Sequence, residues 1–145
     1  MSKRAIILAG GEGTRLRPYT NDLPKPLVAI ADMPIIEIIV RQLANLGFDE
    51  ITITINYKGE QIKNFFEERS DLSVNIDYVE EKKPLGTMGS VLLAKSLPEN
   101  FLVLNGDILT NLNFDDFFHN HFKNKNLLTV STFRRKVKSD YGEII

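Results

Sequence analysis

A chain of 145 residues with 43% hydrophobic and 26% charged residues is long enough for one globular domain and too short for two ordinary ones. Its 18 Lys and Arg against 19 Asp and Glu give a formal net charge of -1, so no global field favours nucleic acid or an anionic membrane. Cysteine is absent, which excludes disulfides, thiol nucleophiles and thiolate metal sites. The N-terminus shows no export signal or long apolar stretch, so we expect a cytoplasmic protein with no membrane partner.

Apolar runs of strand length alternate with segments of helical period. The runs lack the polar alternation of a half-exposed sheet, which is typical of buried parallel strands. The predicted strands are Ala5–Leu8, Ile51–Ile55, Val74–Val79, Phe101–Leu104 and Leu127–Thr132.

Four helices are expected between and after these strands. A stripe from Ile35 to Leu46 begins near Pro34 and stops at Gly47, and Ile62, Phe65 and Phe66 mark a second helix. The other two are Thr87–Lys95 and Phe114–Phe122, the latter with Asn113 as its cap and with Asp115 and Asp116 in its first turn. This alternation predicts an α/β fold, a doubly wound and mostly parallel sheet. Ligands of such sheets bind beyond the carboxyl ends of the strands, here the segments Ala9–Lys25, Glu80–Gly89 and Asn105–Asp107.

The segment after the first strand is rich in glycine. Gly10, Gly11 and Gly13 are followed by Thr14 and Arg15. A glycine-rich turn lets backbone N–H groups approach phosphate oxygens, and an arginine can neutralise the same polyphosphate. The pattern is neither a Walker A loop nor the dinucleotide fingerprint, and the structural alternative is a simple tight turn.

Ten residues beyond Arg15, Lys25 stands between Pro24 and Pro26. The prolines have fixed φ and push the lysine toward an extended conformation, so its charge is positioned by a stiff segment. With Arg15 it could hold two phosphates against each other, as phosphoryl transfer requires. Alone, the same three residues would be a rigid surface turn.

The run Leu8-Ala9-Gly10-Gly11-Glu12-Gly13-Thr14-Arg15-Leu16, with Pro18, Thr20, Pro24-Lys25-Pro26 and Pro34-Ile35, resembles the signature of the sugar-1-phosphate nucleotidylyltransferase family. Residues 80–89 resemble its base-recognition loop, and Asn105-Gly106-Asp107 resembles its metal-binding turn. The resemblance implies a Rossmann-like domain that joins an NTP and a sugar 1-phosphate to give an NDP-sugar and pyrophosphate. It implies catalytic roles for Arg15, Lys25 and Asp107, and a nucleotide site made of Leu8, Ala9, Gly10, Gly11, Gly13, Thr14, Arg15, Glu80, Gly86 and Thr87.

Two of these assignments also have support from the residues themselves. Asp107 follows a buried strand, and Mg²⁺ prefers one or two carboxylates together with substrate oxygens and water. The structural alternative is an ordinary Asn-Gly-Asp turn. Gly86-Thr87 at the start of a helix could contact a base edge through its backbone, and the alternative is a glycine at a loop-to-helix junction.

The base and the sugar are narrower expectations. The form Pro-Leu-Gly-Thr-Met-Gly at residues 84–89 is similar to that of mannose-1-phosphate guanylyltransferases and related heptose enzymes. Glu80 is a pure acceptor that could pair with the two guanine donors. We therefore favour GTP, with mannose 1-phosphate first and heptose or glucose 1-phosphate close behind. The resemblance also implies that Lys25 and Gly142 contact the sugar phosphate.

The chain ends in what looks like the beginning of another strand, Asp140–Ile145. We therefore expect residues 1–145 to be an incomplete catalytic domain, apparently truncated at the C-terminus. An inactive or regulatory nucleotide-binding module is the alternative, and a homo-oligomer stays open. An oxidoreductase is disfavoured, because no acidic residue stands in Leu23–Ala31, where a ribose ligand is expected. The cluster Arg134, Arg135, Lys136 and Lys138 lacks interleaved aromatics, so no nucleic-acid partner is expected.

Overall fold

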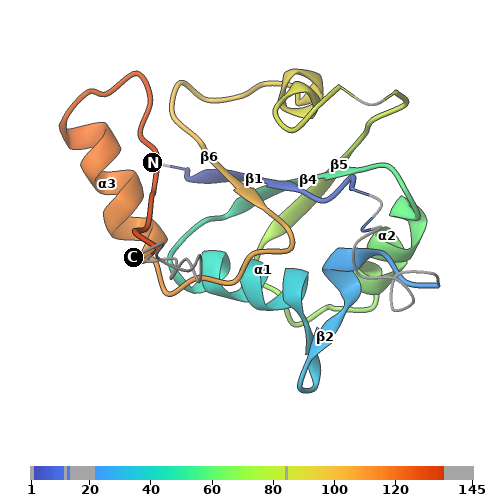
Figure 1. Ribbon diagram of the computed structural model, residues 1–145. Helices are drawn as coiled ribbons and strands as arrows, with labels where there is room; N and C mark the ends of the chain where they lie inside the picture. The colour runs from blue at the N-terminus through green and yellow to red at the C-terminus, as the bar shows by residue number, and fades with distance from the viewer. Residues whose placement is uncertain (1, 12, 14–21, 84, 136–145) are drawn as a thin grey trace, which may run out of the picture.

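A four-stranded sheet forms the centre of the protein (Figure 1). The structure, a computed structural model, describes residues 2–11, 13, 22–83 and 85–135. All three pairings in this sheet are parallel, and the strand order is β5-β4-β1-β6. The strands are β1 (Arg4–Leu8), β4 (Glu50–Ile55), β5 (Asn75–Glu80) and β6 (Leu102–Asn105). The first four predicted strands are thus confirmed, with ends shifted by one residue.

The connections cover both faces of the sheet. The first two crossovers carry α1 (Ile35–Asn45) and α2 (Gly59–Glu67), which lie below the sheet in Figure 1. The chain then returns from β5 to β6 above the sheet, through the short 3-10 helix η3 (Gly89–Leu93). The predicted doubly wound α/β fold is therefore confirmed.

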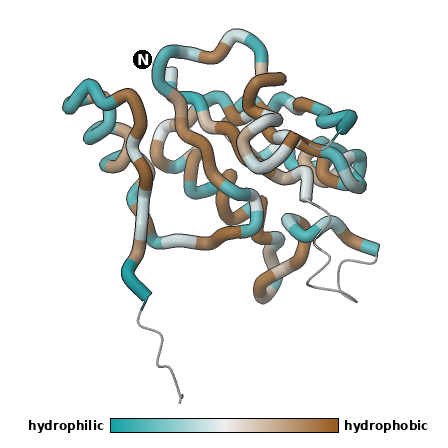
Figure 2. The backbone as a smooth tube through the Cα atoms, turned by 45° about the horizontal axis from the view of Figure 1, so that its top comes forward, coloured by the Kyte–Doolittle hydropathy of each residue, from teal (hydrophilic) through white to brown (hydrophobic). Residues whose placement is uncertain are grey.

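The core lies between the sheet and the helices on its lower face. Alternate residues of the two central strands point there, and Ile51, Ile53 and Ile55 are at most 1% exposed. The stripe of α1 packs on them, and Leu43 is fully buried. From α3 (Phe114–Lys123), Phe118 meets Phe48 edge-on at 5.6 Å between ring centroids. Figure 2 shows the same arrangement as apolar runs in the strands and polar colouring in many of the turns.

The helix ends follow the sequence signals. Gly47, at a φ of 79°, donates to Ala44 O, and this left-handed residue ends α1 where the sequence predicts it. The side chain of Asn113 accepts from the backbone N–H groups of Asp115 and Asp116, so it is the expected cap of α3. In α3, His121 contacts Thr129 and Asn100 through its two ring nitrogens.

A row of polar side chains crosses the upper face of the sheet, from the buried Arg4 and Thr52 to the exposed Asp77. Arg4 of β1 donates to Thr52 Oγ1, whose hydroxyl donates to Asp77 on β5. The Arg4 guanidinium also holds the backbone oxygens of Lys95 and Ser96, at 3.1 and 3.2 Å. These bonds attach the returning segment to the sheet, so its course is set by polar contacts and by a small apolar contribution from Val91.

Two predicted elements are wrong. Thr87–Lys95 is not an α-helix, because the segment buries only Ser90 and Val91 while Leu92 stays 88% exposed, too little contact to support several helical turns. Leu127–Thr132 is not a strand, since it pairs with no described strand and Leu127 is fully exposed. No helix within the described ranges is long and apolar enough to cross a membrane.

Candidate active site at the carboxyl edge of the sheet

The candidate site lies where the strand order reverses. From β1 the chain adds β4 and β5 on one side, and then returns to place β6 on the other side of β1. The carboxyl ends of β1 and β6 therefore flank the switch point, where doubly wound sheets bind ligands. The glycine-rich turn follows β1, and Asn105-Gly106-Asp107 ends β6, so two of the three predicted segments meet at this point.

Backbone hydrogen bonds fix the glycine-rich turn on both sides. Ala9 N donates to Thr54 O at 3.0 Å, and Gly106 N donates to Leu8 O at 2.9 Å. A Cβ on Gly106 would lie 3.1 Å from Ile7 Cγ2 and 3.2 Å from Leu8 O, so a side chain there would push the two turns apart. Glycine at this position lets the backbone before Asp107 lie directly against the end of β1.

Lys25 begins the 3-10 helix η2 (Lys25–Leu27), which precedes the hairpin β2 (Ala29–Ile30) and β3 (Met33–Pro34). The expected extended conformation of Lys25 is therefore wrong. Pro24 is extended and its carbonyl accepts from Leu27 N at 2.9 Å, while Pro26 occupies a position whose N–H would have no helical partner. The segment is still held in place, because Lys25 lies in a 3-10 helix whose other two residues, Pro26 and Leu27, are buried.

An ion pair joins the two strongest candidates in the sequence. Lys25 Nζ donates to Asp107 Oδ2, and the two side chains are 32% and 28% exposed. Residues 82 positions apart are brought together by the return of β6 to the side of β1. The pair lies partly out of water, where attraction between charges is stronger than at a fully solvated surface.

Asp107 already binds one cation, because its Oδ2 accepts a hydrogen bond from the Lys25 ammonium. Among the described residues, no group of three His, Cys, Asp or Glu side chains converges in a way that could hold a metal ion. A metal at Asp107 would thus have at most one further ligand of these types among the described residues. That number fits Mg²⁺, which is commonly bound by one or two carboxylates with substrate phosphates and water.

Glu81 connects the glycine-rich turn to the third predicted segment. A Cβ built on Gly10 would lie 3.3 Å from Glu81 Oε2, and Glu81 Oε1 accepts from Leu85 N. The backbone of Glu81 is itself held, since its N–H donates to Ile55 O at 2.9 Å. Sequence reasoning missed this residue. The alternation of β5 was the available signal, because Ile76 and Tyr78 pack on the core and Glu81 falls on the opposite face.

Glu80, the acceptor named from the sequence, is exposed at the end of β5 on the side of α2. The hydrogen bond that Lys63 on α2 donates to Glu60, with smaller contributions from the charges of Glu60, Glu80 and Glu67, raises the pKa of Lys63. Gly86 has a φ of 79°, and no atom of the described part of the chain lies within 4 Å of its Cβ position. Thr87 is exposed, so both residues are accessible in the loop beyond Glu81. Thr14, Arg15 and Gly142 lie outside the described residues.

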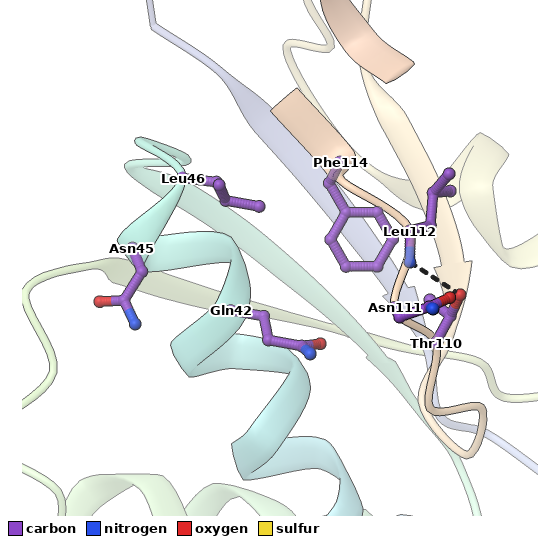
Figure 3. Close-up of a pocket in the computed structure, with 7 residues that line it drawn as sticks. All are labelled: Gln42, Asn45, Leu46, Thr110, Asn111, Leu112 and Phe114. Atoms are coloured by element: carbon purple, nitrogen blue, oxygen red, sulfur yellow. Dashed lines mark hydrogen bonds between the residues drawn. The ribbon is translucent and has the colours of Figure 1, made fainter. Parts of the chain in front are cut away.

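A separate hollow of about 250 Å³ lies between α1 and the segment that joins β6 to α3 (Figure 3). Gln42, Asn45 and Asn111 contribute amides to its lining, and Gln42 Oε1 is buried with no hydrogen-bond partner among the described residues. Leu112 N donates to Thr110 Oγ1 at 3.1 Å in its wall. None of the predicted site residues lines this hollow.

A parallel doubly wound sheet with polar side chains gathered at its switch point defines a Rossmann-like α/β protein. Solved structures agree with this fold. HddC from Yersinia pseudotuberculosis, in a complex with GMP-PN, superposes with a TM-score of 0.73 at 30% identity, over 82% of this chain and 54% of that one. A UDP-glucose pyrophosphorylase from Acinetobacter baumanii gives 0.74 at 25% identity, over 86% and 54%.

Sequence comparisons identify the family. The profile described as "Nucleotidyl transferase" matches residues 4–145, so this chain belongs to the nucleotidyl transferase family. The mannose-1-phosphate guanylyltransferase catalytic subunit beta of Drosophila pseudoobscura pseudoobscura is 35% identical over 98% of this chain and 40% of its own length. The D-glycero-alpha-D-manno-heptose 1-phosphate guanylyltransferase of Aneurinibacillus thermoaerophilus is 36% identical over 97% and 62%. The chain thus spans about 40 to 60% of these relatives.

Proposed function

We propose that this chain is the nucleotide-binding part of a sugar-1-phosphate nucleotidylyltransferase. In the proposed reaction, a sugar 1-phosphate and an NTP give an NDP-sugar and pyrophosphate. The observation that supports this most directly is the Lys25–Asp107 pair beside the glycine-rich turn, because a cation and a carboxylate lie together at the switch point, where such sheets bind ligands. The printed names of the relatives, which are guanylyltransferases and a pyrophosphorylase, support the same reaction class.

The residues suit a direct displacement at phosphorus. A phosphate oxygen of the sugar phosphate is already an anion at neutral pH, so the nucleophile needs no general base. Backbone N–H groups of Gly10 and Gly11 would bind the nucleotide phosphates, and Lys25 would hold the incoming phosphate beside them. Asp107 would hold Mg²⁺, which supplies charge neutralisation on the phosphates. Arg15 and Thr14 would complete the nucleotide site, and Gly142 the sugar site.

We favour GTP as the nucleotide. Glu81 is a strong acceptor held between the glycine-rich turn and the loop that carries Gly86 and Thr87, and guanine offers two neighbouring donors, N1–H and N2–H₂. A carboxylate facing uracil or thymine finds one donor. Glu81 would therefore make the contact with guanine that the sequence analysis expected of Glu80. The guanylyltransferase names of the relatives and the GMP-PN complex of HddC point the same way.

Two further parts of the proposal follow from the substrates. Mannose 1-phosphate and heptose 1-phosphate are the favoured sugars, and glucose 1-phosphate is the third. The protein would act in the cytoplasm, without nucleic acid or membrane partners, and association of identical copies stays open. The alternative is a nucleotide-binding module without transfer activity.

Pyrophosphate release by the 145-residue chain tests the proposal. GTP, UTP, dTTP and CTP are each paired with mannose, heptose and glucose 1-phosphates in the presence of Mg²⁺. We expect sugar-dependent release with GTP that is lost in Lys25→Ala and Asp107→Ala. Lys63→Ala, which removes a half-buried lysine of α2 outside the site, is the matched control and retains activity. Nucleotide binding without release would support the binding module, and the absence of both would contradict the proposal.

A further inference from the structure

The pair between Lys25 and Asp107 bears on how the proposed site acquires its metal. The ammonium of Lys25 occupies Oδ2 of Asp107, the carboxylate that the proposed function assigns to the metal. We propose that Lys25 is an internal cation that masks Asp107 in the nucleotide-free protein and leaves it when a divalent cation binds. This inference rests on the proposed function for the identity of the site, but it concerns cation binding without nucleotide.

The backbones on both sides of the pair are fixed. Val28 N donates to Lys25 O at 3.1 Å, Pro26 and Leu27 are buried, and Gly106 N is bonded to Leu8 O. Exchange of the cation therefore needs no movement of either turn. It needs only a rotation of the long lysine side chain, which is 32% exposed and has water on one side into which it can move.

Competition between the two cations follows because both would use the carboxylate of Asp107. No group of three His, Cys, Asp or Glu side chains forms among the described residues, so a divalent ion there depends on Asp107 with at most one further ligand of these types. A divalent ion on Oδ1 with Lys25 still on Oδ2 would place three positive charges within a few ångströms in a partly desolvated site. The lower-energy arrangement has one cation at Asp107 and the other turned away.

The exchange links metal binding to binding of the second substrate. While Lys25 is paired with Asp107, its charge is neutralised and it attracts an anion weakly. Once a divalent ion takes Asp107, the ammonium is available to a phosphate group. By thermodynamic reciprocity, an anion that captures Lys25 must strengthen cation binding at Asp107 by the same factor.

Mn²⁺ is a direct probe of the mask, because the electron paramagnetic resonance signal of the free ion reports binding without any reaction. The nucleotide-free chain is titrated as wild type, Lys25→Met, Lys25→Arg, and Lys25→Met combined with Asp107→Asn. Methionine keeps the length of the side chain and removes its charge, whereas arginine keeps the charge. Lys63→Met is the matched control for loss of a lysine outside the site. Thermal unfolding confirms that each variant is folded, and Lys25→Gln replaces the methionine variant if needed.

We expect Lys25→Met to bind Mn²⁺ on the order of tenfold more tightly than wild type, from the loss of the competing pair and of its repulsion. Lys25→Arg and Lys63→Met should resemble wild type, and the double variant should lose the gain. Equal or weaker Mn²⁺ binding by Lys25→Met, or no binding by any variant, overturns the inference. Neither result depends on nucleotidyl transfer. Tighter Mn²⁺ binding by Lys25→Met in a protein that neither binds nucleotide nor releases pyrophosphate would refute only the proposed function.

Discussion

The carboxylate of Glu81 lies against the backbone of Gly10, where a Cβ would approach Glu81 Oε2 to 3.3 Å. This relationship joins the turn after β1 to the loop after β5, which are 71 positions apart in the sequence. The same carboxylate receives the N–H of Leu85, so Glu81 organises its own loop while one oxygen faces the turn. A ligand that spans both turns would meet this side chain.

Replacing Glu81 by glutamine tests this arrangement against the neighbouring Glu80. The amide keeps an oxygen for Leu85 N, so the loop should persist, but it loses the charge that strengthens bonds to guanine donors. We expect Glu81→Gln to weaken GTP binding about tenfold or more, in line with about 1.5–3 kcal/mol for a hydrogen bond to a charged group. Calorimetric titration with GTP measures this effect.

Glu80→Gln is the matched control, since it makes the same chemical change one residue away on the α2 side of β5. Its GTP affinity should equal that of wild type. The assignment of the base contact to Glu81 fails if Glu80→Gln is the variant that loses affinity, and that result would restore the sequence-based choice.

Gly11 offers a test of the phosphate cradle that leaves the fold intact. A Cβ at Gly11 would have no atom of the described residues within 4 Å, so alanine should not lower the free energy of unfolding. The added methyl group would nevertheless stand on a turn whose backbone N–H groups are proposed to meet phosphate oxygens. We expect Gly11→Ala to show an unchanged unfolding midpoint and at least a tenfold loss of GTP affinity, roughly 1.4 kcal/mol. Unchanged affinity would mean that phosphates do not approach this side of the turn.

Gly59 provides the opposite case, in which a methyl group harms the fold. A Cβ there would lie 2.8 Å from Ile55 Cβ, and Ile55 is 1% exposed in the core. Overpacking of this kind costs about 1–3 kcal/mol, partly offset because alanine favours a helix by about 1 kcal/mol over glycine. We expect Gly59→Ala to lower the free energy of unfolding in urea by about 1–2 kcal/mol. GTP affinity of the folded protein should not change, and an equally stable variant would show that α2 can shift away from β4 without cost.

The comparison of sequence with structure separates local signals from those that depend on a neighbour. Gly47 and Asn113 act within a few residues of their own helices, so the ends of α1 and α3 were predictable. Leu127–Thr132 has strand composition, but a strand exists only where another strand accepts its hydrogen bonds, and none of the described strands does. The failed helix at Thr87–Lys95 has the same cause, because its apolar residues find little surface to cover.

The site shows the same division. The glycine-rich turn, Lys25 and Asp107 could be named from residue types and from their positions after strands, but their pairing could not. It depends on β6 returning beside β1, which is a property of the strand order. Glu80, the last residue of β5, and Glu81, which follows it, are chemically identical neighbours, and only the direction of each side chain distinguishes them. The conformation of Lys25 was mispredicted because Pro26 permits a 3-10 turn when the chain before it is extended.

Tyr78 gives a prediction for the dependence of stability on pH. Burial on the helical face of β5, with the charge of Glu67, raises the pKa of Tyr78 from 10.0 to about 12. The folded chain therefore keeps a proton that the unfolded chain loses, so this contribution is complete below pH 10.0 and is lost as the pH rises to about 12. The tyrosinate absorbance of wild type minus that of Tyr78→Phe should titrate near 12, and the variant should lose stability less steeply over this range. A difference titration centred near 10.0 would show that water reaches the Tyr78 hydroxyl freely.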